Sequence, residues 1–339
     1  MRVLMITSTW PSPGRPCTTH FIKRQAEAVR AAGVDLTVFR FHGRRNPLRY
    51  AGAWFRLRRS LARTRYDVVH AQFGQSGLLA LPMRAPLVVT FRGSDLLGIV
   101  DDATGRHTAR GRALQWASGL VARRADVVLL VSEHMRTSLP PGVRYEVMPS
   151  GVDLELFTPT PRNEARARLG LPLDRRLVLF AGRPTQARKR YGLAARAVEL
   201  LSRTLPAELL VAWGVPHEEV PLYMSAADAL VFTSMQEGSP NVVKEALACD
   251  LPVVSVPVGD VAERLDGIEG CELCADDRAE TIAAALERVL VRGGRIDARD
   301  RMRALDEQSI TRRLLDVYAA AAGRPAAASP AREATHELV

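Results

Sequence analysis

Two glutamates, Glu237 and Glu245, are eight positions apart and could together bind one ligand. The pattern around them predicts a strand, a short loop that carries Glu237, and a helix that carries Glu245. A helix start presents unpaired N–H groups and a positive dipole end, which favour an anion. Carboxylates accept hydrogen bonds from hydroxyls, so this arrangement suits a ligand with hydroxyls beside phosphate. Glutamates in a loop and on a helix are also common on solvated surfaces, so the pair alone does not distinguish a ligand site from a solvated surface.

The local sequence predicts where this strand and helix begin and end. An apolar run after Asp228 is expected to end as a strand at Ser234. Ser239 occupies the position of an N-cap, and Pro240 that of the first helical residue. The helix should then run to about Cys249.

A second group of charges follows another apolar run, residues 177–181. Arg183 and Lys189 are six residues apart, after a glycine turn at Gly182. A guanidinium binds phosphate oxygens in a bidentate way and a lysine adds a point charge, so the pair suits a diphosphate. A solvated basic loop over residues 188–190 is the alternative.

Both groups belong to a chain in which apolar strands alternate with helical patterns. The strands expected in the first half cover residues 2–8, 34–39, 67–71, 86–91, 126–131 and 143–148. Those in the second half cover residues 177–181, 207–213, 229–233 and 252–256. Strands this apolar imply parallel sheets covered on both faces, with a site in the crevice at their carboxyl ends.

Proline and glycine residues between positions 148 and 161 predict a linker. We therefore expect domains over residues 1–153 and 154–307. A last helix over residues 308–322 should return toward the N-terminal domain. The Ala- and Pro-rich tail over residues 323–339 is expected to be disordered.

The sequence Glu-Gly-Ser-Pro-Asn-Val-Val-Lys-Glu-Ala-Leu-Ala from position 237 resembles the core of a known family. It is followed by Leu-Pro-Val-Val-Ser and Val-Gly-Asp-Val-Ala-Glu, and together they are similar to family 4 retaining glycosyltransferases of the GT-B fold. That fold places two Rossmann-like α/β domains, with parallel sheets, across a cleft. The family pattern of Glu, seven residues and Glu matches Glu237 and Glu245. The resemblance covers nearly the whole chain and is weakest over residues 40–65 and after 290.

The resemblance implies that a hexose-type sugar moves from a nucleoside diphosphate, UDP or GDP, to an acceptor hydroxyl with retention of configuration. The acceptor would be a glycan, a glycolipid or a small molecule, bound by the N-terminal domain. Glu237, Arg183 and Lys189 would form the catalytic set, with Glu237 on the donor sugar and the two cations on its diphosphate. Glu245 would bind the nucleotide ribose. The further donor-binding residues implied are Gly14, Gly238, Ser239, Pro240, Asn241 and Val242.

The acceptor or sugar side would include His70, Arg92 and Asp95. His70 is expected to end a strand at the crevice, where it contacts the acceptor or serves a structural role. Many relatives have a histidine at the position of Arg92 and a glycine at that of Thr19. Arg92 stays protonated and cannot act as a base, but it can bind an anionic sugar or phosphate. The stretch from residue 213 to 224 is shorter than in many relatives. That region usually holds the nucleotide base, so the resemblance does not predict which base binds.

No Asp-x-Asp motif with strand context predicts a metal site, so we expect a metal-independent enzyme without a cofactor. Cys271 and Cys274 have the spacing of a zinc half-site or a redox pair. A structural zinc site needs about four ligands, and no second pair follows. We interpret the two cysteines as buried small residues.

The net charge of +10 is unevenly distributed. Residues 1–150 contain 23 Lys and Arg against 9 Asp and Glu, a net charge of +14, and residues 151–339 contain 24 against 28, a net charge of −4. Residues 36–66 contain nine arginines and no acid. A helix over residues 49–63 would place Trp54, Leu57 and Leu61 on one stripe. The stripe either packs on the sheet, the interpretation we favour, or lies on an anionic membrane with residues 40–65 at its surface.

No run of ~20 apolar residues and no signal peptide is present, so we expect a cytoplasmic protein, associated at most peripherally with the inner membrane face. A nucleotide-sugar epimerase of the same fold is the main alternative. A phosphorylase would need a pyridoxal cofactor and a longer chain. A nucleic-acid partner is not expected, because no recognised binding module accompanies the basic half.

Overall fold

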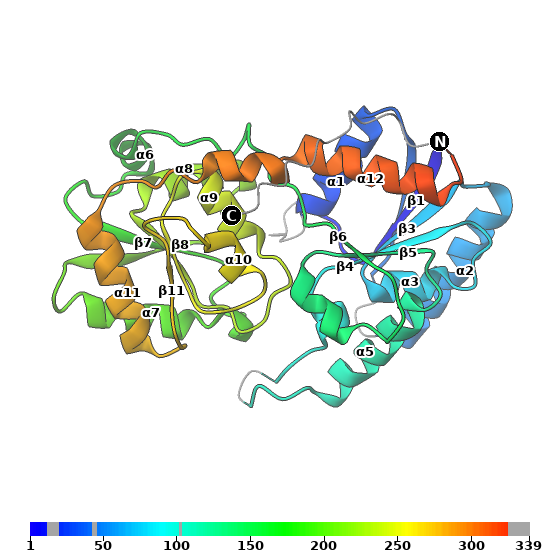
Figure 1. Ribbon diagram of the computed structural model, residues 1–339, viewed down its shortest axis with the longest axis horizontal. Coiled ribbons are helices and arrows are strands. Elements are labelled where there is room, and N and C mark those ends of the chain that lie inside the picture. The colour runs from blue at the N-terminus through cyan, green and yellow to red at the C-terminus, as the bar shows by residue number, and fades with distance from the viewer. Residues whose placement is uncertain (12–19, 43–45, 102–103, 325–339) are drawn as a thin grey trace, which may run out of the picture.

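The computed structural model describes residues 1–11, 20–42, 46–101 and 104–324. Two α/β domains lie side by side, each built on a parallel sheet (Figure 1). The N-terminal sheet has the strand order β2-β1-β3-β4-β5-β6, and the C-terminal sheet has the order β11-β10-β9-β7-β8. Two Rossmann-like domains with parallel sheets confirm the predicted α/β class.

The N-terminal strands are β1 Arg2–Thr7, β2 Asp35–Arg40, β3 Val68–Gln72, β4 Leu87–Phe91, β5 Val127–Leu130 and β6 Glu146–Val147. The helices between them are α1 His20–Ala31, α2 Pro47–Arg63, α3 Gly74–Ala80, α4 Ser94–Leu97, α5 Ala109–Ala122 and the 3-10 helix η1 Glu133–Ser138. The last strand is shorter than the expected run over residues 143–148.

The C-terminal strands are β7 Arg176–Ala181, β8 Ala207–Ala212, β9 Ala229–Phe232, β10 Val253–Ser255 and β11 Glu272–Leu273. The α-helices are α6 Arg162–Leu169, α7 Tyr191–Leu201, α8 Val220–Ala226, α9 Asn241–Ala248, α10 Val261–Leu265, α11 Ala279–Arg292 and α12 Glu307–Ala321. Short 3-10 helices are η2 Ala187–Lys189, η3 His217–Glu219 and η4 Arg299–Leu305.

Both faces of each sheet are covered, which explains the continuous apolar runs of the strands. In β1, Val3 and Met5 face the α1 side, whereas Leu4 and Ile6 face the side of α2, α3 and α5. The stripe of α2 packs on this second face, with Leu57 fully buried. In the C-terminal sheet, α7 and α11 pack on one face and α9 on the other.

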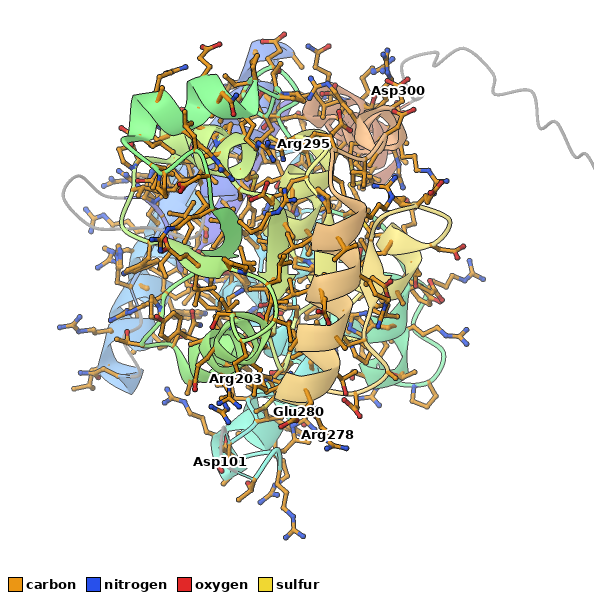
Figure 2. All side chains as sticks on the ribbon, turned by 90° about the vertical axis from the view of Figure 1, so that its left-hand side faces the viewer. Asp101, Arg203, Arg278, Glu280, Arg295 and Asp300 are labelled. Atoms are coloured by element: carbon orange, nitrogen blue, oxygen red, sulfur yellow. The ribbon has the colours of Figure 1, made fainter. Side chains whose placement is uncertain are left out.

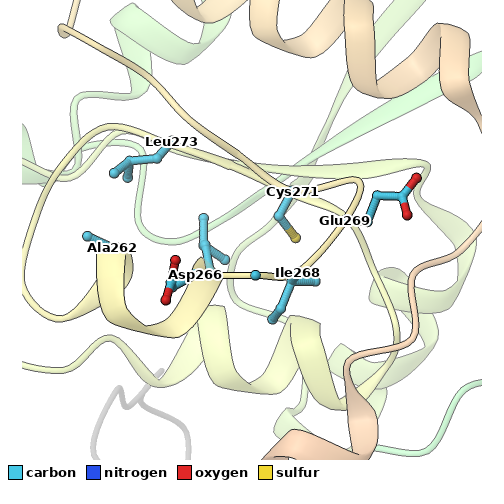
Figure 3. A pocket seen from close by; sticks show the side chains of 8 residues that line it. Ala262, Asp266, Ile268, Glu269, Cys271 and Leu273 are labelled. Carbon is cyan, nitrogen blue, oxygen red and sulfur yellow. The ribbon is translucent and has the colours of Figure 1, made fainter. Parts of the chain in front are cut away.

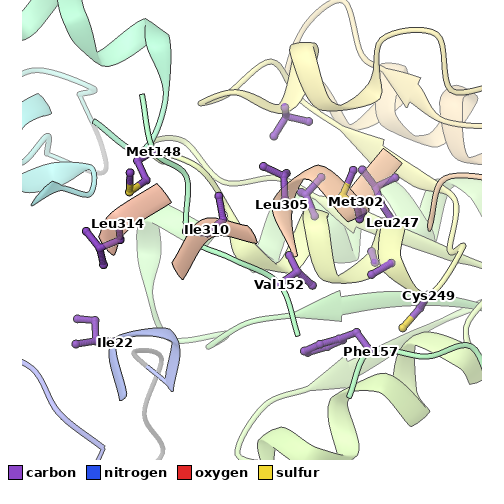
Figure 4. Close-up of a cluster of buried hydrophobic side chains, with 14 of the residues drawn as sticks. Ile22, Met148, Val152, Phe157, Leu247, Cys249, Met302, Leu305, Ile310 and Leu314 are labelled. Carbon is purple, nitrogen blue, oxygen red and sulfur yellow. The ribbon is translucent and has the colours of Figure 1, made fainter. Parts of the chain in front are cut away.

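The chain passes between the domains twice, and the two passages share one apolar core (Figure 4). Met148, Val152 and Phe157 of the first passage pack in the same cluster as Leu305 and Ile310 of the second. Val152 also exchanges backbone hydrogen bonds with the second passage, donating to Leu305 at 2.9 Å. The linker is therefore held on both sides.

Helix α12 starts at the second passage and runs along α1 of the N-terminal domain (Figure 1). Its residues Leu314, Val317 and Tyr318 are buried in the core under the N-terminal sheet. The predicted last helix over residues 308–322 thus lies on the N-terminal domain. Of the predicted tail, residues 325–339 lie outside the described part.

A buried ion pair ties α6 to the start of β9. The guanidinium of Arg166, only 1% exposed, donates to Asp228 at 2.7 Å and to the carbonyls of Pro172, Leu173, Arg175 and Ala226.

None of the helices in the described part of the chain has the length and apolar character needed to cross a bilayer.

We expect Arg166→Ala to lower the free energy of unfolding by about 3–5 kcal/mol, because it removes one of the two cations on the buried Asp228 carboxylate and the buried donor to four backbone carbonyls. Arg168→Ala is the matched control on the same helix, since Arg168 is exposed and only 3.9 Å from Glu164. It should change stability by less than about 0.5 kcal/mol. Urea denaturation measures both, and equal stabilities of the two variants would contradict this account.

Candidate active site

The carboxyl ends of the two sheets meet at a cleft of about 840 Å³. Loops after β4, β7, β8 and β9 line it, together with α1 and the start of α9. The structure brings eleven predicted site residues together there: Arg92, Asp95, Arg183, Lys189, Glu237, Gly238, Ser239, Pro240, Asn241, Val242 and Glu245. Gly14 lies outside the described residues, as does Thr19.

The Glu237 carboxylate is held by two cations. Its Oε1 accepts hydrogen bonds from Lys189 Nζ at 2.6 Å and from Arg188 Nη1 at 2.7 Å. Burial alone would raise the pKa of Glu237, but these two cations outweigh it and lower the pKa below its usual value. Glu237 is therefore ionised at neutral pH. The sequence offers Arg188 only as part of the alternative, a solvated loop, and does not predict this contact.

Glu245 has the opposite environment. Its side chain is buried, and no hydrogen bond to its carboxyl group comes from the described residues. Burial raises its pKa to about 7, although Arg24 and Lys244 act in the other direction. A carboxyl group that changes charge near neutral pH and has free acceptor oxygens can bind a ligand hydroxyl.

The helix behind these acids starts one residue later than expected. Helix α9 begins at Asn241 with Pro240 as N-cap residue, and no side chain caps it. Ser239 is not the N-cap, because its hydroxyl donates to Asp260 at 2.8 Å. The Asn241 Oδ1 atom is buried without a partner among the described residues. The uncapped helix start thus faces the cleft with free polar groups.

Arg183 has no ion-pair partner among the described carboxylates. Its Nε donates to Thr185 at 2.8 Å, and its guanidinium lies 5.8 Å from the ring centre of Trp213. The remaining donors of this exposed side chain are available to an anion in the cleft.

Arg92 bridges the N-terminal domain and the linker. Its guanidinium donates to neutral oxygens of Gln72, Gln25 and Ser150, and lies 4.7 Å from the ring centre of Phe21. No described carboxylate forms a salt bridge with it, although the nearby Asp95 offsets part of its charge. The side chain lines the cleft.

Asp95 holds the backbone of the loop that carries Arg92 in place. Its carboxylate accepts hydrogen bonds from the backbone N–H groups of Gly74, Arg92 and Gly93 at about 3.0 Å. Burial raises its pKa to about 6, against the lowering effect of these bonds. Asp95 lines the cleft, but both oxygens are used by the backbone, so we interpret it as a positioning residue.

The prediction that His70 ends a strand at the crevice is wrong. His70 lies in the middle of β3, is fully buried, and bonds to Tyr318 Oη at 2.6 Å and Thr90 Oγ1 at 2.8 Å. Burial lowers its pKa to about 3. Since both ring nitrogens are bonded inside the protein, the alternative structural role applies: His70 joins the sheet to α12.

The two domains touch through glycines beside the acids. A Cβ at Gly238 would lie 2.4 Å from the carbonyl oxygen of Arg92, and one at Gly93 would lie 3.2 Å from the Gly238 nitrogen. Ser132 adds a hydrogen bond to the Gly238 carbonyl at 3.1 Å. The loop that carries Glu237 can therefore approach the N-terminal domain only because side chains are absent here.

Sequence reasoning also missed Phe21, Arg24 and His217, which line the cleft. Burial and the nearby Arg24 lower the pKa of His217 to about 4, and its ring stacks on that of His20 at 4.8 Å. The position of His217 after the carboxyl end of β8 is the signal that could have identified it.

A second hollow, of about 490 Å³, lies at α10 and the following loop, with Asp266, Glu269 and Cys271 at its wall (Figure 3). It contains none of the predicted site residues. Burial raises the pKa of Cys271 and that of Cys274 to about 11, so both are protonated thiols. Within the described ranges, no three His, Cys, Asp or Glu side chains cluster as a metal site would require.

Two protein-family models match the chain: Glycosyltransferase Family 4 over residues 15–156 and Glycosyl transferases group 1 over residues 208–292. A D-inositol 3-phosphate glycosyltransferase of Xylanimonas cellulosilytica is 30% identical over 315 residues, which cover 76% of this chain and 73% of that protein. The chain belongs to glycosyltransferase family 4. This confirms the resemblance, and the protein is a glycosyltransferase.

This family 4 glycosyltransferase is also similar to a protein of Bacillus subtilis (strain 168) assigned to teichuronic acid biosynthesis as the glycosyltransferase TuaC. The two are 28% identical over 355 residues, covering 85% of this chain and 89% of that protein.

Two solved structures share the fold of this family 4 enzyme. Sucrose-phosphate synthase from Thermosynechococcus elongatus has a TM-score of 0.82 at 19% identity, covering 94% of this chain and 98% of that chain. HepE from Anabaena in complex with UDP-glucose has a TM-score of 0.70 at 15% identity, covering 94% and 100%. These likenesses confirm the GT-B fold.

We expect Gly238→Ala to lower kcat/KM about tenfold or more, because the added Cβ meets the Arg92 carbonyl and prevents the close approach of the domains. Overpacking of this kind costs about 1–3 kcal/mol, and 1.4 kcal/mol corresponds to tenfold. Gly192→Ala on α7 is the control, since a Cβ there meets nothing within 4 Å. Steady-state kinetics with unchanged kcat/KM for Gly238→Ala would refute the constraint.

We expect nucleoside diphosphate to bind the wild-type enzyme up to about tenfold more weakly at pH 6 than at pH 8. The pKa of Glu245 near 7 means that its carboxylate, the better hydroxyl acceptor, is lost as pH falls. Calorimetric titration across pH measures this. Glu245→Gln keeps the shape without the ionisation and should remove this part of the pH dependence. Identical pH profiles for both proteins would exclude Glu245 as the titrating group.

Proposed function

We propose that this family 4 glycosyltransferase moves a hexosyl unit from a UDP- or GDP-linked sugar to an acceptor hydroxyl, with retention of configuration and without a metal. The observation that carries the proposal is the juxtaposition of an uncapped helix start, the ionised Glu237 and the unpaired Arg183 in one cleft. A sugar diphosphate has the hydroxyls and the negative charge that these groups complement.

In this proposal the donor diphosphate lies between Arg183, Lys189 and the start of α9. Lys189 uses one of its three ammonium donors on Glu237, which leaves two for phosphate oxygens. These fixed positive groups stabilise the charge that develops on the leaving diphosphate. Glu237 accepts hydrogen bonds from sugar hydroxyls, and Glu245 accepts them from the ribose.

Transfer to the acceptor hydroxyl releases a proton, which a base must accept. Arg92 on the N-terminal side of the cleft cannot be this base, because it stays protonated. We propose that the departing phosphate takes this proton. Arg92 and Arg24 both line the cleft, and their positive charges favour a donor sugar or an acceptor that carries a phosphate or carboxylate. The names of the two relatives, which refer to inositol 3-phosphate and teichuronic acid, support an anionic substrate.

The donor proposal has parallel support from HepE, whose structure contains UDP-glucose. For the acceptor we propose a sugar, a glycolipid or a small molecule used in polysaccharide or glycoconjugate synthesis. We place the enzyme in the cytoplasm, with residues 40–65 at the inner membrane face, and without a nucleic-acid partner.

The first test is a screen of UDP-, GDP- and other nucleoside-diphosphate sugars for thermal stabilisation, followed by turnover with the best donor in the presence of EDTA. A transferred sugar with unchanged anomeric configuration supports the proposal. An isomerised or hydrolysed nucleotide sugar formed without any acceptor would instead identify an epimerase.

We expect Arg183→Ala to lower kcat about 100- to 1000-fold, which corresponds to ~2.7–4 kcal/mol of transition-state stabilisation. Folding should be unchanged, because Arg183 has no ion-pair partner among the described residues. Arg203→Ala is the control, since Arg203 lies on the outer face of the C-terminal domain (Figure 2) and, among the described carboxylates, is paired only with Glu199. Wild-type turnover of Arg183→Ala would remove Arg183 from the diphosphate site.

A further inference from the structure

A second basic pocket lies outside the active-site cleft, between the end of β2 and helix α2. It has a volume of about 420 Å³, and Arg40, Arg49 and Arg56 line it together with His42 and Leu48. Three guanidinium groups around one small hollow would repel each other unless an anion joined them. The pocket therefore has the composition of an anion site.

The fold itself does not use these three arginines. None of their guanidinium groups has a hydrogen bond or an ion pair with a described side chain or backbone group, and that of Arg40 lies 5.7 Å from the ring centre of Trp10. Arg58 of the same helix shows the contrast, because its guanidinium donates to the carbonyls of Leu79, Ala80 and Pro82. No acid occurs over residues 36–66 to neutralise the pocket.

Large apolar side chains stand beside the pocket on the outer face of α2. Leu48 is 80% exposed and Phe55 is 67% exposed, seven residues or two turns apart. Arg49 and Arg56 have the same spacing and directly follow Leu48 and Phe55, so the two exposed pairs form adjacent rows on the helix. The opposite side of α2, with Leu57, is already buried against the sheet. The exposed side thus combines apolar anchors with cations, as in helices that lie in a membrane interface.

The pocket and the cleft lie at the same edge of the N-terminal sheet. Strand β2 is the edge strand of the N-terminal sheet, and Arg40 is its last residue, at the carboxyl end. The carboxyl ends of the N-terminal strands are also the edge from which Arg92 and Gly93, after β4, reach the cleft. A molecule anchored at α2 would therefore lie along the same edge as the active site.

We propose that the outer side of α2, with Leu48, Arg49, Phe55, Arg56 and the adjacent Arg40, docks the enzyme on an anionic bilayer, and that the pocket binds the phosphate of a lipid headgroup. Arginines provide the attraction to the phosphate layer, and the two apolar side chains enter the acyl boundary. The inference extends the proposed membrane location and does not depend on sugar transfer.

The test is co-sedimentation of the full chain with vesicles of phosphatidylcholine alone and with 30% phosphatidylglycerol. We expect binding to the anionic vesicles, weakened by salt, and little binding to the neutral ones. Each surface arginine contributes about a fivefold factor, so Arg49→Gln with Arg56→Gln should weaken partitioning about 25-fold. Phe55→Ser should weaken it further without changing the salt dependence.

The matched control combines Arg168→Gln and Leu173→Ser, an exposed arginine and an exposed leucine of the C-terminal domain. It should bind vesicles as the wild type does. Donor-induced thermal stabilisation should be the same in all variants, which separates this inference from the proposed glycosyl transfer.

Three results would overturn the proposal: no binding to anionic vesicles, equal loss in the control, or wild-type binding by the double arginine variant. A titration with inorganic phosphate distinguishes the source of the anion. Binding of phosphate that depends on Arg49 and Arg56, without vesicle binding, would identify a soluble phosphate site and reject membrane docking. Salt-sensitive binding of a DNA duplex in place of vesicles would reject it as well.

Discussion

Ser150 connects the two halves of the active site through one residue of the linker. Its hydroxyl accepts from Arg92 of the N-terminal domain at 2.7 Å, and its carbonyl accepts from Lys244 of α9 at 2.8 Å. Lys244 is fully buried, so it cannot leave this carbonyl without losing its only described hydrogen-bond partner. The apolar residues of α9, such as Val243 and Leu247, pack in the core that both interdomain passages share. The linker therefore holds α9 and the Arg92 loop together beside the cleft, and the contact between Gly93 and Gly238 joins the two domains at a second point.

Two residues of one type acquire opposite properties within this frame. Glu237 lies in a loop with its side chain 13% exposed, and two cations keep it charged. Glu245 is buried on the helix without such a partner, and its pKa lies near neutrality. The difference arises from neighbours and not from the residue itself. One acid thus presents a permanent charge to the ligand, and the other presents a charge that the ligand and the pH can change.

The fold followed from the sequence because buried parallel strands need apolar side chains on both faces, and these runs are visible without any contact information. The grouping of Glu237, Glu245 and the helix start at one cleft could be predicted as well, because they are within a dozen residues of each other. The errors concern partners distant in sequence. The sequence around His70 does not reveal its buried role, because its partner Tyr318 comes from the last helix. The local sequence predicts Ser239 as an N-cap and cannot show its bond to Asp260, which depends on how the loop after the next strand folds. Likewise, the contact of Arg188 with Glu237 arises only when β7 and β9 become neighbours.

The path of α12 has a consequence for how the protein is made. The N-terminal domain is built from the first residues to leave the ribosome, yet one face of its sheet is completed by Leu314, Val317 and Tyr318. During synthesis this face stays open until nearly the whole chain has emerged, and His70 lacks its tyrosine partner for the same period. A nascent chain with both sheets formed is therefore still unfinished at its first domain. The domain that is synthesised first is therefore completed last. Until the final helix packs on it, this domain exposes apolar surface that a chaperone could cover.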